Sequence, residues 1–99
     1  MRAIHVVRLD KPRPAVLLTR EGVLGVLSSV TVAPITSRMR GLSVEVGVGV
    51  ANGLDGPGVI NCDNIVTIDS ADVGRRIGSL LPEQERLLTE AILAAFDLE

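Results

Sequence analysis

Small apolar residues alternate with polar residues or glycine over much of the chain. The clearest case is SVEVGVGV at residues 43–50, where every second residue is valine and serine, glutamate or glycine fills the positions between. A period of two is typical of a strand, so we predict a strand at 43–50 with all four valines on one face. Glycines on the other face favour the sharp bending that a small barrel requires.

Shorter segments of the same kind predict further strands, with Gly, Pro and Asp marking the turns between them. The predicted strands are residues 3–9, 14–19, 29–36, 59–61, 64–68 and 77–80. A tight connection, DKPR, joins the first two, and Pro12 and Pro14 stiffen it around Arg13. We expect loops at 21–27 and 52–58, and a helical turn at 69–75 capped by Ser70.

The C-terminal segment has the period of a helix. Pro82 suits the first helical position, and Glu83 and Glu85 suit the positive end of the helix dipole. Apolar residues then recur at helical spacing: Leu87, Leu88, Ala91, Ile92, Ala95 and Phe96. We expect this face to pack on the strands, with a partner helix or a second copy of the chain as the alternative.

Several short strands followed by one helix indicate a mainly β (α+β) fold: a small, partly open barrel of the SH3-like kind with a C-terminal helix. The 99 residues suit one domain, 1–99, and 46% of them are hydrophobic. Because the chain has one Phe and no Trp or Tyr, its core must consist of Val, Ile, Leu and Ala.

The apolar runs and the single cysteine indicate a cytoplasmic protein with no membrane contact. The longest runs, such as AVLL at 15–18, fall far short of the roughly 18 residues of a membrane-spanning helix, and the N-terminal segment lacks the pattern of a signal peptide. Cys62 has no partner for an internal disulfide, which agrees with a reducing compartment. We expect Cys62 to be a small buried residue.

Charge is divided unevenly along the chain. Residues 1–40 hold seven Lys or Arg against two acids, a balance of +5, whereas the remainder holds three Arg against ten acids, a balance of −7. Such asymmetry favours one face for a polyanion, with charges scattered by chance as the alternative.

The composition argues against several classes of site. One histidine, His5, and one cysteine offer no metal-ligand spacing, so we expect no metal site and a packed or surface role for His5. The segment GVGVANG at 47–53 lacks the spacing and the following helix of a phosphate-binding loop, which argues against ATP and dinucleotides. No cofactor is predicted.

Arginines and hydroxyl groups remain as candidates for chemistry, and several gather in VTVAPITSRMRG at residues 30–41. A guanidinium group binds phosphate through its planar fork, and a threonine hydroxyl can donate to the same oxygens. RNA carries its own nucleophile, the 2′-hydroxyl, which can attack the adjacent phosphorus. A protein that orients RNA and stabilises the developing charge could therefore cut it without a metal ion.

Each candidate also has a simpler interpretation. Arg13 could pair with a neighbouring acid, the Thr36 hydroxyl could bond locally, and Arg38 and Arg40 could belong to a solvated turn. Alternation puts Thr36 and Ser37 on opposite faces of a strand, so we expect only one of them to point at a given ligand.

Four motifs occur in the order and spacing of the MazF/PemK family of toxin endoribonucleases: RPAVLLT (13–19), VTVAPITS (30–37), DNIVTID (63–69) and AAFDL (94–98). The chain resembles that family over nearly its whole length, above all its actinobacterial, mycobacterial-type MazF members. The resemblance implies a CcdB/PemK-type barrel, a homodimer, and the toxin of a type II toxin-antitoxin system. Its activity would be sequence-specific, metal-independent cleavage of single-stranded RNA, whether messenger, ribosomal or transfer RNA, which inhibits translation and growth.

The resemblance also assigns residues and a partner. Arg13 and Thr36 match the family's catalytic arginine and threonine. The residues expected to bind RNA are Lys11, Ser37, Arg38, Arg40, Asp63 and Asn64. A cognate MazE-type antitoxin with an acidic, flexible tail is implied as the protein partner, occupying the RNA groove.

The chain departs from the family pattern near its start. Arg2 and Ala3 replace the usual basic residue and Gly-Glu or Gly-Asp, and Arg8 stands where an acid is common. The first loop is shortened to LDKPRP, so a recognition sequence cannot be transferred. Two other functions stay open: a non-enzymatic inhibitor of gyrase like the CcdB toxins, although this chain ends FDLE without Trp, and a module that binds RNA without cutting it.

Overall fold

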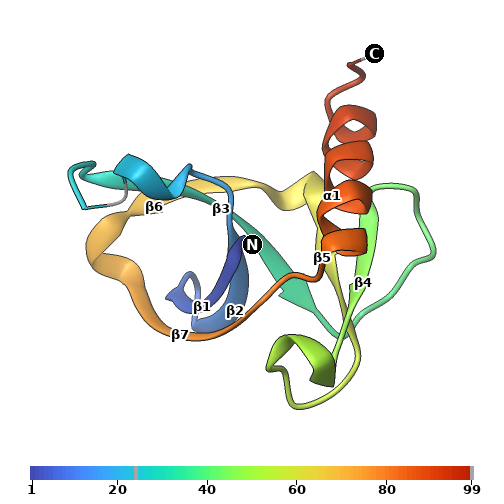
Figure 1. Ribbon diagram of the computed structural model, residues 1–99, viewed down its shortest axis with the longest axis horizontal. Coiled ribbons are helices and arrows are strands. Elements are labelled where there is room, and N and C mark those ends of the chain that lie inside the picture. The colour runs from blue at the N-terminus through green and yellow to red at the C-terminus, as the bar shows by residue number, and fades with distance from the viewer. Residues whose placement is uncertain (24, 99) are drawn as a thin grey trace.

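The computed structural model describes residues 1–23 and 25–98 (Figure 1). The strands in this part of the chain are β1 (Ala3–Arg8), β2 (Pro12–Leu17), β3 (Ser29–Thr36), β4 (Glu45–Val48), β5 (Gly58–Asn61), β6 (Val66–Asp69) and β7 (Val73–Ser79). One helix, α1 (Pro82–Ala95), follows them. Short 3₁₀ turns occupy Glu21–Val23, Val50–Asn52, Cys62–Asn64 and Ser70–Asp72.

The strands form one bent antiparallel sheet. Their order is β4-β5-β3-β2-β1-β7, with β6 paired to β3. Because β4 and β7 stand at the two ends of this order, the sheet does not close within the described residues. Figure 1 shows α1 standing beside β4 and β5, with β7 crossing the lower side of the molecule. The predicted mainly β fold, a partly open barrel with a C-terminal helix, is confirmed.

Strand β3 has the predicted bounds, 29–36, and continues through Pro34. One edge of β3 pairs with β2, and the other pairs first with β6, over 29–32, and then with β5, at Ile35 and Thr36. Pro34 lies where this second edge changes from β6 to β5. Because proline has no N–H to donate, it fits the gap between two ladders without ending the strand.

The two prolines of β2 limit its pairing with β3. The N–H of Leu18 donates to the carbonyl of Thr31, so alternate residues before Leu18 also direct their nitrogens toward β3. Pro12 and Pro14 stand at two of these positions and have no hydrogen there. The β2–β3 ladder accordingly begins only at Ala15, and the two strands are unpaired beyond it.

The strand predicted at 43–50 is shorter in the structure. Strand β4 ends at Val48, and Val50 begins a 3₁₀ turn in which it is 72% exposed, so the prediction that all four valines share one face of a strand was wrong for Val50. The chain turns because the side-chain oxygen of Asn52 accepts a hydrogen bond from the N–H of Gly49, at 3.0 Å.

The prediction for residues 69–80 was also wrong in detail. The helical turn is limited to Ser70–Asp72, and Asp69 caps it in place of Ser70, because its carboxylate accepts the N–H of Ala71 at 3.0 Å. Strand β7 begins at Val73, four residues earlier than expected, because pairing with β1 holds this segment extended.

Buried aliphatic side chains form the core, as the composition requires. The larger group lies between α1 and the sheet, and the fully buried Ile4, Ile60, Leu80 and Leu88 belong to it. Burying one such side chain stabilises the fold by about 1.5–3 kcal/mol. The helix packs on the strands through its predicted apolar face, except that Phe96 lies beyond the end of α1 and is 56% exposed.

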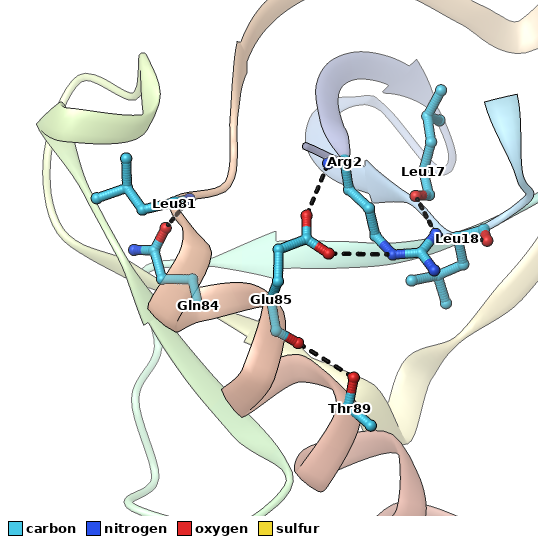
Figure 2. A network of polar contacts seen from close by, with 7 residues as sticks. All are labelled: Arg2, Leu17, Leu18, Leu81, Gln84, Glu85 and Thr89. Carbon is cyan, nitrogen blue, oxygen red and sulfur yellow. Dashed lines mark hydrogen bonds and ion pairs between the residues drawn. The ribbon is translucent and has the colours of Figure 1, made fainter.

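Arg2 and Glu85 tie the start of the sheet to α1 (Figure 2). The carboxylate of Glu85 accepts the backbone N–H of Arg2 at 2.7 Å, and its other oxygen lies 3.7 Å from Arg2 Nε. The same guanidinium donates to the carbonyls of Leu17 and Leu18, at 3.4 and 2.8 Å. One side chain thus joins the first residues of the chain, the end of β2 and the helix.

Candidate active site

Two neighbouring hollows meet at the end of β3. Four residues line both of them: Arg13, Ile35, Thr36 and Ser37. The first, which we name the β7 hollow, has a volume of about 800 Å³ and extends to Arg75 and Arg76. The second has a volume of about 650 Å³ and extends to Arg38 and Arg40. These two arginines belong to the segment that connects β3 to β4, so we name it the β3–β4 hollow. Both volumes fall within the range of ligand-binding clefts.

Strand register explains why Arg13 and Thr36 come together. Strands β2 and β3 pair from Leu17 with Val32 to Ala15 with Pro34. Two further steps along each strand lead to Arg13 and Thr36, which therefore share one face of the sheet. Both residues border the hollows and neither belongs to the buried core.

Arg13 forms a two-pronged ion pair with Asp10. Its Nε lies 2.8 Å from Oδ1 of Asp10 and its Nη2 lies 3.0 Å from Oδ2. These hydrogen bonds lower the pKa of Asp10 to about 2 and raise the pKa of Arg13. The simpler interpretation, pairing with an acid, is therefore realised. It uses only two of the five N–H donors of the guanidinium, so the remaining donors can still bind an anion.

The hydroxyl of Thr36 bonds locally as well. Its Oγ1 accepts the backbone N–H of Arg38 at 3.1 Å, which orients the oxygen and leaves the hydroxyl hydrogen able to donate. Strand β3 ends at Thr36, so strand alternation does not govern Ser37. Both residues line both hollows, and the expectation that only one of them points at a given ligand stays a prediction.

Basic side chains dominate the β7 hollow. Among residues 1–23 and 25–98, Arg13, Lys11, Arg75 and Arg76 line it with a single acid, Asp55. Residues 53–58 also line this hollow, and at Gly53 their backbone packs directly on β7. Gly53 has a φ of +90°, and a Cβ there would lie 2.0 Å from the carbonyl oxygen of Ile77, so only glycine permits this packing.

A carboxylate supports the edge of the β3–β4 hollow. Glu45 accepts hydrogen bonds from the backbone N–H groups of Arg40, Gly41 and Leu42, at 2.9 to 3.2 Å. These bonds hold the backbone next to Arg40 in a compact turn, so its side chain stands at the rim of the hollow. Arg38 and Arg40 are both exposed, as a solvated turn would also require.

The structure brings most of the predicted RNA contacts to these hollows. Lys11 lines the β7 hollow, Arg38, Arg40 and Asn64 line the β3–β4 hollow, and Ser37 lines both. Asp63 lines neither: its side chain is exposed, and its backbone N–H donates to Asn61 Oδ1 at 2.9 Å.

The lining or supporting residues that were not selected from the sequence include Asp10, Asn61, Arg75 and Arg76. Asp10 could have been found from its position three residues before Arg13. Arg75 and Arg76 could not, because they lie in the net acidic part of the chain and alternation assigns neighbours to opposite faces. The division of charge along the sequence therefore does not match the faces of the molecule.

The remaining reactive groups lie outside the hollows. Cys62 is 1% exposed, and burial raises the pKa of its thiol to about 11, so the prediction of a buried cysteine is confirmed. Nδ1 of His5 lies 2.9 Å from the carbonyl oxygen of Gly74. In residues 1–23 and 25–98, no group of three or more His, Cys, Asp or Glu side chains is placed to hold a metal ion. Over the same residues, no helix has the length and apolar character to span a membrane.

Known proteins resemble the chain in sequence and in fold. Residues 7–96 match the family described as PemK-like, MazF-like toxin of type II toxin-antitoxin system. Endoribonuclease MazF3 of Mycobacterium tuberculosis is 56% identical over 99 residues, which are 100% of this chain and 96% of that protein. The structure of the Mycobacterium tuberculosis toxin MazF-mt6 superposes with a TM-score of 0.96 at 55% identity, covering 99% of both chains.

A more distant structure shares the fold alone. It is an endoribonuclease from a mycobacterial species, solved in complex with its cognate antitoxin. It has a TM-score of 0.85 at 20% identity and covers 98% of this chain and 93% of its own.

Proposed function

The chain belongs to the family of PemK-like, MazF-like toxins of type II toxin-antitoxin systems and is an endoribonuclease, and we propose that Arg13 and Thr36 are its catalytic residues for cutting single-stranded RNA. The observation that carries this proposal is that both side chains line both hollows. An RNA strand that passes from one hollow to the other presents a phosphate to both residues.

The reaction uses the nucleophile of the substrate. The 2′-hydroxyl attacks the adjacent phosphorus, the bond from phosphorus to the 5′ oxygen breaks, and a 2′,3′-cyclic phosphate and a 5′-hydroxyl remain. The proton lost by the 2′ oxygen is balanced by one gained by the leaving 5′ oxygen. Negative charge grows on the non-bridging phosphoryl oxygens, so donors aimed at those oxygens lower the barrier.

Arg13 and Thr36 supply such donors. Asp10 holds one edge of the Arg13 guanidinium and orients the other N–H groups. The Thr36 oxygen is held by the N–H of Arg38, so its hydroxyl hydrogen is available to a phosphoryl oxygen. The substrate contacts we propose in addition are Lys11, Ser37, Arg38, Arg40 and Asn64, from the linings of the two hollows.

We also propose a cognate antitoxin with an acidic segment as the protein partner. The basic lining of both hollows would bind carboxylates as it binds phosphates, so antitoxin and RNA would compete. A cytoplasmic location is consistent with this partner and with the RNA substrate.

A homodimer is the third part of the proposal. Met39, Leu42 and Val66 are 54%, 47% and 40% exposed beside or in the β3–β4 hollow. Apolar side chains gathered at the edge of a site favour an interface. Sedimentation equilibrium should give twice the mass of the chain, 10.4 kDa, and a monomer at micromolar concentration would contradict this part.

The decisive experiment maps the 5′ ends of RNA cut by the purified protein in EDTA. We expect cleavage at defined sequences, and none when the nucleotide before the cut carries a 2′-deoxy substitution. Arg13→Ala should abolish cutting, whereas Arg86→Ala, which removes an equal charge from the outer face of α1, should not. Cleavage by Arg13→Ala at the wild-type rate would refute the assignment. A gyrase inhibitor or a module that only binds RNA is not favoured, since the relative that is 56% identical is an endoribonuclease.

A further inference from the structure

Strand β7 directs two adjacent arginines into one hollow. In a regular strand, neighbouring side chains point to opposite faces of the sheet. Arg75 and Arg76 are neighbours in β7, both are exposed, and both line the β7 hollow. Both side chains can face the same hollow where the strand departs from regular alternation.

Register shifts between β1 and β7 account for the departure. The pairs are Ile4 with Gly78, His5 with Arg76, and Val7 with Val73. From Ile4 to His5, one step along β1 matches two steps along β7. From His5 to Val7, two steps along β1 match three steps along β7. Strand β7 carries one extra residue on each side of Arg76. Bulges of this kind re-aim side chains and are frequent beside active sites.

Close backbone contacts hold these bulges in place. A Cβ at Gly74 would lie 2.8 Å from the carbonyl oxygen of Val6, so the strands approach there as only glycine allows. The carbonyl of Gly74 also lies 2.9 Å from Nδ1 of His5. Nε of Arg76 donates to the carbonyl of Gly78 at 3.3 Å, which uses one of its five N–H groups.

The chemistry of the hollow matches an RNA backbone. In the part of the chain that the structure describes, its four cationic side chains outnumber its one acid, Asp55. The only aromatic residue of the chain, Phe96, does not line it, so stacking on an aromatic ring cannot bind a base there. A guanidinium group that forms no ion pair with a carboxylate can donate two parallel hydrogen bonds to the oxygens of a phosphate.

We propose that Arg75 and Arg76 form a second phosphate-binding site, which holds the RNA strand next to the scissile phosphate and extends substrate recognition along β7. The inference rests on the proposed function, and places RNA on a part of the chain that the family motifs do not include. Their role is to bind and position the substrate, whereas the bond is broken at Arg13 and Thr36.

The test compares short and long substrates. Once the cut site is mapped, a minimal RNA is extended by several nucleotides in the 5′ direction or in the 3′ direction. We expect one extension to raise kcat/KM for the wild type, and Arg75→Ala and Arg76→Ala each to lose about fivefold on the extended RNA through KM. On the minimal RNA, each variant should lose less than it loses on the extended RNA.

A binding measurement completes the test. The binding constant K is measured with an uncleavable RNA that carries 2′-deoxyribose at the cut. The plot of log K against log salt concentration has a negative slope, which should become less steep by about 0.7 for each phosphate that the variant no longer neutralises. Arg86→Ala is the matched control, because Arg86 lines neither hollow and pairs with Glu83 and Glu90. Equal losses on short and long RNA, or an unchanged salt slope, would overturn the proposal. A wild type that cuts no RNA would instead refute the proposed function.

Discussion

The carboxylate of Asp10 accepts two hydrogen bonds from one edge of the Arg13 guanidinium: Nε lies 2.8 Å from Oδ1, and Nη2 lies 3.0 Å from Oδ2. The two residues are three apart, across the short connection between β1 and β2. The side chains of Arg13 and Asp10 are 35% and 68% exposed, and exposed pairs contribute little to stability. The contact therefore matters for the direction in which Arg13 points, and the carboxylate becomes a positioning residue for the arginine.

Asp10→Asn should slow RNA cutting. The amide can accept only one of the two bonds well and carries no charge, so Arg13 loses its fixed direction. We expect kcat to fall about tenfold to a hundredfold, as misplaced catalytic groups commonly cause. Asp55→Asn, at the wall of the same hollow, is the control and should stay within about threefold. Rates of Asp10→Asn equal to the wild type would show that Arg13 needs no such support.

The pH dependence follows from the lowered pKa of Asp10. In the folded protein this pKa is about 2, below the ordinary 3.8. The pair therefore stabilises the fold above about pH 4, and this contribution is lost as the pH falls through about 2. Arg13, whose pKa is raised, stays protonated throughout. The carboxyl chemical shift of Asp10, followed by NMR, should titrate near pH 2, and a midpoint near 4 would contradict the contact.

Two substitutions at Thr36, one without a hydroxyl and one with it, test whether the hydroxyl takes part in the reaction. Thr36→Val keeps the shape of the side chain and removes both the donor and the acceptor for the N–H of Arg38. We expect kcat to fall about 10²- to 10³-fold, the usual cost of removing one donor to developing charge. Thr36→Ser keeps the hydroxyl and should recover most of the rate in single-turnover assays. A Val variant as fast as Ser would exclude the hydroxyl from the reaction.

Glu85→Ala should loosen the docking of α1. It removes the acceptor of the Arg2 N–H and the partner of its guanidinium (Figure 2). We expect the free energy of unfolding in urea to fall by about 1–2 kcal/mol, because the hydrogen bond that is removed involves a charged acceptor. Since neither residue lines the two hollows, kcat should not change. Thr89→Ala, which removes only a bond to the carbonyl of Glu85, should cost less than about 0.5 kcal/mol.

Much of the fold could be predicted from local sequence. The bounds of β3 and the start of α1 at Pro82 agree with the predictions, because alternation, proline and acidic residues act over a few positions. Val50 was misplaced for the opposite reason. Its valine continues the alternation, but Asn52 turns the backbone at Gly49 by a side-chain bond that periodicity does not record.

The candidate site, like the fold, could be predicted in part from the sequence. Arg13 and Thr36 were selected through motifs, but the two hollows that they line are formed by several strands and loops, which motifs do not describe. The shared lining of Thr36 and Ser37 was missed, since it depends on where β3 ends.

The sequence by itself determined the mainly β fold, the terminal helix and the aliphatic core, and it supplied the candidate residues for chemistry. Only the tertiary structure decided that Arg75 and Arg76 stand in the same hollow as Arg13. The physical reason is that side-chain direction in a strand depends on its register with the neighbouring strand. The register between β1 and β7 shifts on both sides of the pair His5 and Arg76, and no local pattern in either strand contains these shifts.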